Sequence, residues 1–108
     1  MRAIVVPYDR PPYTIQSKEE AREIDYQPLK DMLTTIPHPF DWFEIVNVQV
    51  GHILVQMYLD EEGKMRNGWM ERVNPIASML YGNPNDVIVG DVVLFLDKHD
   101  GDTYLFDD

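Results

Sequence analysis

The sequence contains no cysteine among its 108 residues, and this absence excludes several kinds of protein. Without cysteine there is no disulfide framework, no thiolate metal site and no cysteine nucleophile. No apolar run approaches the roughly 18 residues of a membrane span, and the N-terminus lacks the basic and then apolar order of a signal peptide. We therefore expect a soluble, cytoplasmic protein without a membrane partner.

Basic residues are also scarce, since nine Lys and Arg stand against 19 Asp and Glu, for a formal net charge of −10. Direct binding to nucleic acid needs clustered Lys and Arg, so this balance argues against it. The last 23 residues are the most acidic part, with seven Asp and one Lys. Such runs are usually solvated surface. The alternative is a face for a basic partner, centred on Asp97, Asp100 and Asp102.

With 44% hydrophobic and 11% aromatic residues, the chain is apolar enough to fold, and its length suits one domain over residues 1–108. Short β-branched and aromatic runs predict strands over residues 1–7, 14–16, 42–48, 52–59, 87–96 and 103–106. The close spacing of the third and fourth runs favours an antiparallel hairpin. The expected fold is α+β, a mostly antiparallel sheet of about five strands with two short helices and an acidic C-terminal hairpin.

The first predicted helix covers residues 26–36. Four apolar residues recur with the spacing of one helical face, namely Leu29, Met32, Leu33 and Ile36. Asp25 is a suitable N-cap, and Pro37 cannot continue the helix.

The second predicted helix covers residues 75–81. Asn74 followed by Pro75 is a strong helix start, and Gly82 supplies a left-handed stop. We expect three residues on its buried side, namely Ile76, Met79 and Leu80. Two further glycines carry conformational predictions. Gly63 lies in a polar turn where a positive φ would be useful, and Gly90 before Asp91 suggests a bulge or a close backbone approach within the strand 87–96.

No motif in the chain names a reaction, and we predict no catalytic residue, cofactor or metal. The three histidines, His38, His52 and His99, lie far apart, in places that are ordinary for an unliganded histidine. There is no glycine-rich nucleotide-binding loop and no nucleophile elbow around either serine. A pair of carboxylates could act in acid–base catalysis, but among 19 acidic residues the sequence singles out no such pair.

One segment combines residues suited to binding an anionic ligand, namely Lys64, Arg66, Trp69, Arg72 and Asn74. Arg and Trp together can clamp a planar or phosphorylated group. The alternative is that Trp69 packs into the core and the bases balance nearby acids. For Asn74 the two roles differ in a testable way, because a residue that only caps a helix tolerates replacement by Asp, whereas an amide that binds a ligand does not.

Four stretches, in order along the chain, resemble one family: residues 1–7, 57–64, 73–77 and 86–93. The most specific are the stretch from Asn74 to Ala77 and the stretch VIVGDVV at residues 87–93. They resemble domain-of-unknown-function family 3846, whose members occur in phages, plasmids and bacteria. The resemblance implies a mobile-element context and brings no activity or catalytic residues.

Two classes of function therefore compete. The leading hypothesis is a non-enzymatic binding or inhibitor protein of a mobile element that counters host defence. It would block a basic, nucleic-acid-binding host protein through its acidic face, or sequester an anionic nucleotide signal at the segment from Lys64 to Asn74. The alternative is a small nucleotide-processing enzyme or hydrolase. Self-association as a homo-oligomer is left open.

Overall fold

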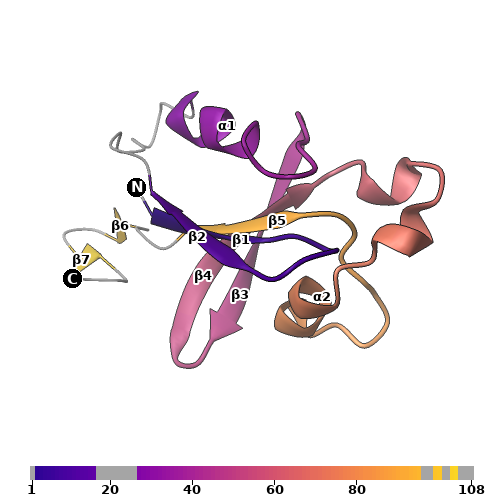
Figure 1. Cartoon of the computed structure of the whole chain (residues 1–108). Coiled ribbons are helices and arrows are strands. Elements are labelled where there is room, and N and C mark those ends of the chain that lie inside the picture. The colour runs from indigo at the N-terminus through magenta and orange to yellow at the C-terminus, as the bar shows by residue number, and fades with distance from the viewer. Residues whose placement is uncertain (1, 17–26, 96–98, 101–102, 105–108) are drawn as a thin grey trace.

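The computed structural model describes residues 2–16, 27–95, 99–100 and 103–104. Its centre is a five-stranded antiparallel sheet with the strand order β2-β1-β5-β4-β3 (Figure 1). The strands are β1 (Arg2–Val6), β2 (Tyr13–Gln16), β3 (Phe43–Val50), β4 (Ile53–Asp60) and β5 (Val92–Phe95). A separate antiparallel pair joins β6 (His99–Asp100) and β7 (Thr103–Tyr104). The predicted α+β class is confirmed.

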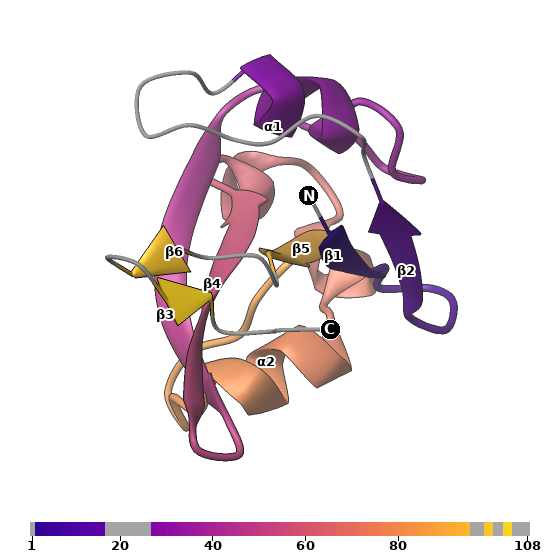
Figure 2. The same cartoon turned by 90° about the vertical axis from the view of Figure 1, so that its left-hand side faces the viewer.

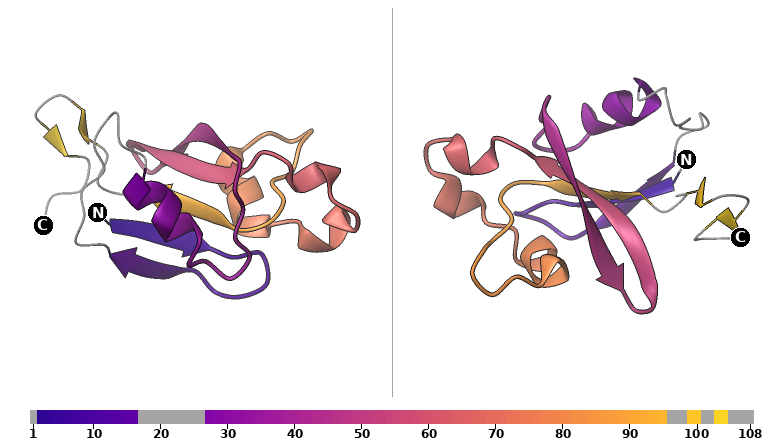
Figure 3. Two further views of the ribbon diagram at one scale, coloured as in Figure 1. Left: turned by 90° about the horizontal axis from the view of Figure 1, so that it is seen from above. Right: turned by 180° about the vertical axis from the view of Figure 1, so that it is seen from behind.

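One helix packs on each face of this sheet. Helix α1 (Gln27–Leu33) lies above the sheet and helix α2 (Pro75–Tyr81) lies below it in the view of Figure 1, and Figure 3 shows the same layers from above and from behind. Because side chains of a strand alternate between its faces, the sheet supports two buried clusters. The α1 side holds Ala3, Val5, Tyr58, Val93 and Phe95 with Met32, Leu33 and Ile36. The α2 side holds Val6, Val55, Met57, Val92 and Leu94 with Ala77.

Strand β5 occupies the middle of the sheet, and all four of its residues are buried. The strand predicted over residues 87–96 is wrong in its first half, because only an isolated bridge between Val73 and Val89 precedes Gly90. Gly90 has a φ of 82° and interrupts the strand. A Cβ at Gly90 would meet nothing within 4 Å, so the glycine is needed for its backbone conformation and not for a close approach.

Helix α1 ends three residues before the predicted end of the 26–36 helix. The Thr34 and Thr35 hydroxyls donate to the carbonyls of Asp31 and Met32 at 2.6 and 2.7 Å, and these local bonds compete with further helical bonding. Ile36 still packs in the core beyond the helix. The predicted cap at Asp25 lies outside the described residues.

Helix α2 has the predicted bounds, with Asn74 as N-cap and Gly82 as a left-handed C-cap at a φ of 73°. The prediction that Met79 is buried is wrong, because its side chain is 73% exposed. Ala77 is the fully buried residue of this helix. Met79 follows Ala77 by two positions, about 200° around the helix, and so points to solvent.

The β3–β4 hairpin is confirmed, with Val50 paired to Ile53 across the two-residue connection Gly51-His52. Figure 2 shows this hairpin and the β1–β2 pair on opposite sides of the molecule. The predicted positive φ at Gly63 is wrong, since Gly63 is not among the glycines with that conformation. It is buried against Val89 instead, and a Cβ there would lie 3.2 Å from the Val89 carbonyl oxygen.

Two 3₁₀ helices, η1 (Gly63–Met65) and η2 (Trp69–Arg72), connect β4 to α2. Within the described ranges, no helix has the length and apolar character needed to cross a membrane.

Candidate functional site

The predicted basic segment lies on η1 and η2, where each of its three cations has a partner in the same chain. Lys64 forms an ion pair with Asp86. Arg66 Nε donates to Asp60 Oδ2 at 3.0 Å. Arg72 Nη2 donates to the Asn67 carbonyl at 3.1 Å, and no carboxylate pairs with Arg72 in the described part of the chain. Trp69 lies between Arg66 and Arg72 in the sequence, and its side chain is half-buried.

Carboxylates dominate the surroundings of this segment. The hydrogen bond from Arg66 to Asp60 raises the pKa of the Arg66 guanidinium, with the Asp60 charge adding to the effect. Lys64 and Asp86 line a cleft of about 110 Å³ whose walls include Glu44, Asp60 and Glu61. Lys64 and Arg66 are thus each paired with a carboxylate, and an anionic ligand would have to displace Asp86 and Asp60 from these cations.

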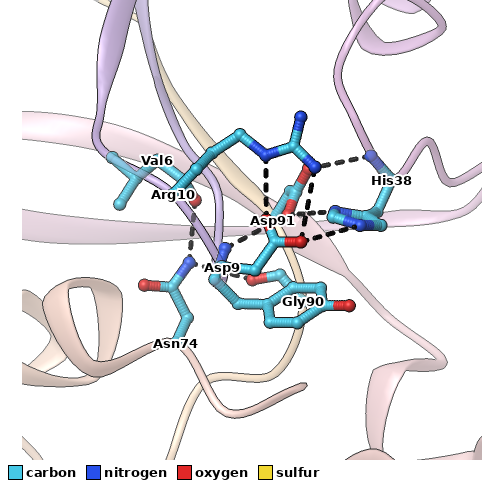
Figure 4. Close-up of polar contacts among 8 residues, drawn as sticks. Val6, Asp9, Arg10, His38, Asn74, Gly90 and Asp91 are labelled. Atoms are coloured by element: carbon cyan, nitrogen blue, oxygen red, sulfur yellow. Dashed lines mark hydrogen bonds and ion pairs between the residues drawn. The ribbon is translucent and has the colours of Figure 1, made fainter. Parts of the chain in front are cut away.

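Asn74 is fully buried, and its side chain uses all its hydrogen-bonding groups inside the fold. Its Oδ1 accepts from the Ala77 N–H at 3.0 Å, which confirms the N-cap. Its Nδ2 donates to the Val6 carbonyl at 2.7 Å and to the Gly90 carbonyl at 2.9 Å (Figure 4). These two bonds argue against the expectation that a capping Asn74 would tolerate Asp, because a carboxylate would face two carbonyl oxygens. A ligand-binding role for this amide would require those bonds to break.

Of the predicted partner-binding residues, Asp97 and Asp102 lie outside the described residues. Asp100 lies in β6, opposite Thr103 of β7. The acidic-face hypothesis for these three residues stays a prediction.

A second polar cluster, which the sequence did not predict, is built around Asp91. This residue directly precedes β5 and is 1% exposed. Its Oδ1 accepts from the Tyr8 N–H at 3.2 Å and lies 2.9 Å from His38 Nδ1, and its Oδ2 accepts from the His38 N–H at 2.9 Å (Figure 4). One carboxylate therefore joins the loop after β1 to the loop after α1. Such a buried carboxylate is tolerable because donors surround it.

His38 extends this cluster to the surface, where its side chain is 34% exposed. With Asp91 ionised, Nδ1 carries the ring hydrogen and donates it, because a carboxylate only accepts. His38 Nε2 lies 3.4 Å from Asp9 Oδ2, and the ring packs on Tyr8 with centroids 4.6 Å apart. We call Asp9, Arg10, His38 and Asp91 the histidine cluster.

Asp9 and Arg10 form the outer, solvent-exposed part of the histidine cluster. Arg10 Nε donates to Asp9 Oδ1 at 3.0 Å. This bond lowers the pKa of the Asp9 carboxyl from its ordinary value and raises that of the Arg10 guanidinium, and the nearby His38 also lowers the pKa of Asp9.

The histidine cluster shares part of its geometry with known proton-transfer sites. A buried carboxylate that fixes the ring and one ring nitrogen near solvent is the arrangement of a general base. Within the described residues, the side-chain partner of His38 Nε2 is the Asp9 carboxylate, and no side-chain hydroxyl is paired with this nitrogen. The sequence held one usable signal, a His between prolines in Pro37-His38-Pro39 together with an Asp inside an apolar run. Nothing in the sequence indicated that they meet across 53 positions.

No set of three or more potential metal ligands comes together in the residues that the structure describes. No protein-family model, curated protein or solved structure matches the chain. The resemblance of its four stretches to the domain family therefore stays a prediction, and the site is interpreted from its own geometry.

Proposed function

We propose that this chain is a non-enzymatic binding or inhibitor protein of a mobile element, which counters host defence by blocking a basic, nucleic-acid-binding surface of a host protein. The observation that supports it is the pairing of Lys64 with Asp86 and of Arg66 with Asp60. In a chain of net charge −10, these pairs remove two of the three cations on which an anion receptor would depend. A basic partner would instead meet the excess of ten acidic over basic residues.

The physical basis is complementary charge. A strongly acidic protein attracts a basic surface over about one Debye length, roughly 8 Å at physiological salt, and repels nucleotides over the same range. Binding of this kind speeds association and weakens as salt is added. The proposal therefore predicts a partner that the chain loses at high ionic strength.

The test is capture of host proteins on the immobilised chain, followed by elution with heparin, a polyanion that competes for basic surfaces. The variant Asp97→Asn, Asp100→Asn, Asp102→Asn should retain at least about tenfold less of the heparin-eluted protein than wild type. The matched control neutralises three exposed acids elsewhere, Glu61→Gln, Glu62→Gln and Glu71→Gln. Equal retention by wild type and the triple Asp variant would overturn the acidic-face proposal.

Sequestration of an anionic nucleotide is the other version of the binding hypothesis. It retains one favourable feature, namely that Arg72 pairs with no carboxylate of the described residues and lies on the same 3₁₀ helix as the half-buried Trp69. Calorimetry with cyclic and adenine nucleotides separates the versions. Our proposal predicts no measurable heat of binding, and a nucleotide that binds wild type but not Arg72→Ala would favour sequestration.

The histidine cluster supports a second candidate function, a small hydrolase or nucleotide-processing enzyme. The supporting observation is the 2.9 Å contact between His38 Nδ1 and the buried Asp91 carboxylate, which orients the ring as in general-base catalysis. Incubation with a nucleotide panel tests it, because binding alone returns unchanged nucleotide and catalysis returns product. Product formation that is lost in His38→Gln and kept in His52→Gln would establish the enzyme.

A further inference from the structure

Strand β3 is a long and unprotected edge of the sheet. It has eight residues and pairs with β4 alone among the described strands. Natural edge strands are usually short, or carry proline or lysine, since an open row of backbone N–H and C=O groups pairs readily with another strand. Strand β3 has neither residue, and Glu44 is its only charge.

The opposite edge of the same sheet shows the contrast. Strand β2 has only four residues, and Pro11 and Pro12 come directly before Tyr13, its first residue. Proline cannot donate a backbone hydrogen bond, so this edge does not extend in that direction. The two edges lie on opposite sides of the molecule (Figure 2), and among the described strands the β3 edge is the longer pairing surface.

From these features we infer that β3 pairs with β3 of a second copy of this chain, antiparallel about a twofold axis through Asn47, to form one continuous sheet of ten strands. This inference does not depend on the proposed function. Pairing would also cover apolar side chains on the strand, since Ile45 and Val50 are 39% and 40% exposed.

The order of backbone groups along β3 agrees with this register. In an antiparallel pair, alternate residues direct both backbone groups at the neighbouring strand, and the residues between them direct both groups outward. Counted from the closing pair Val50–Ile53, the outward set is Phe43, Ile45, Asn47 and Gln49. A twofold axis at Asn47 places Asn47 opposite Asn47 and Ile45 opposite Gln49, so each outward group meets another.

The side chains of β3 are self-complementary in the same register. Val46 faces Val48 of the second copy, so this apolar pair meets on the α2 side, and Glu44 faces Val50 without meeting another charge. The two Glu44 carboxylates are six residues apart along the paired strands, about 20 Å, at roughly 3.3 Å per residue. That separation is about two and a half times the Debye length at physiological salt, so they do not repel strongly. A basic peptide would find no such match, because β3 carries a single carboxylate.

The absence of cysteine allows a direct test of this register. A single-cysteine variant, Asn47→Cys, places two thiols at the axis, and mild oxidation should give a covalent dimer. The control Thr14→Cys, exposed on the other edge strand, should stay monomeric. In the unmodified protein, light scattering should show a dimer that is favoured by added salt, because both copies carry −10.

A charge variant completes the experiment. Asn47→Lys places two like charges at the axis and should weaken dimerisation at least about tenfold, whereas Thr14→Lys should not. Circular dichroism checks that both variants fold. If Asn47→Lys does not fold, the disulfide test decides alone. A wild-type chain that is monomeric at millimolar concentration and high salt, or equal cross-linking of Asn47→Cys and Thr14→Cys, would overturn the inference.

Discussion

Replacing the buried Asp91 by Asn should lower the free energy of unfolding, and the size of this loss follows from the geometry of the hydrogen bonds to Asp91. Three donors bind the carboxylate. Tyr8 N–H and His38 Nδ1 bind Oδ1, and His38 N–H binds Oδ2. An amide offers one oxygen and one NH₂ group. Whichever way it is turned, the NH₂ faces at least one backbone N–H. One buried donor without an acceptor costs about 1–3 kcal/mol.

Equilibrium unfolding in urea, followed by the fluorescence of Trp42 and Trp69, measures this loss. A small domain has an m value of about 1–3 kcal/mol/M, so the midpoint should fall by roughly 1 M with the m value unchanged. Asp9→Asn is the matched control, because it changes the solvent-exposed carboxylate of the histidine cluster and should leave the midpoint in place. Equal midpoints for wild type, Asp91→Asn and Asp9→Asn would refute the view that Asp91 joins the two loops.

Three further predictions concern the neighbouring residues. Asn74→Ala should lower the free energy of unfolding by about 2–4 kcal/mol in urea titration, since it removes the helix cap and two buried hydrogen bonds, and Asn74→Asp should not rescue it. Gly90→Ala should cost about 1–2 kcal/mol by the same assay, because alanine is strained at a φ of 82°. Arg10→Ala should raise the pKa of the Asp9 carboxyl toward its ordinary value of 3.8 in an NMR titration. A carboxyl whose pKa is lowered in the folded state stabilises the fold above its unfolded pKa, and this contribution is lost as the pH falls through the folded pKa. Because the Asp9–Arg10 pair is exposed to solvent, its loss in Arg10→Ala should leave the urea midpoint nearly unchanged.

Local patterns predicted the elements whose causes lie within a few residues. The Asn74-Pro75 start and the Gly82 stop of α2 depend on capping chemistry that neighbouring residues supply, and the structure has both. The β3–β4 hairpin likewise follows from two β-rich runs on either side of Gly51. Errors came where a distant contact overrides the local pattern. Glycine is favoured at position 63 because Val89 packs closely against it, and not because the turn needs a positive φ.

The histidine cluster could not be predicted for the same physical reason. Asp91 sits in an apolar run, and its donors come from Tyr8 and His38, which are 83 and 53 positions away. A single sequence carries no information on which loops meet. The basic segment was visible as composition, but the pairing of Lys64 with Asp86 spans 22 positions and was equally hidden. Composition therefore suggested a ligand site where the fold forms ion pairs.

Native mass spectrometry of the chain purified from host cells tests the proposed function most directly, because it detects a protein partner and a bound nucleotide in one spectrum. We predict a complex of the chain with a basic host protein that dissociates as ammonium acetate is raised. The triple variant of Asp97, Asp100 and Asp102 to Asn should lack this complex. A chain that carries a nucleotide, or one with no host partner even at the lowest salt, would contradict the proposal.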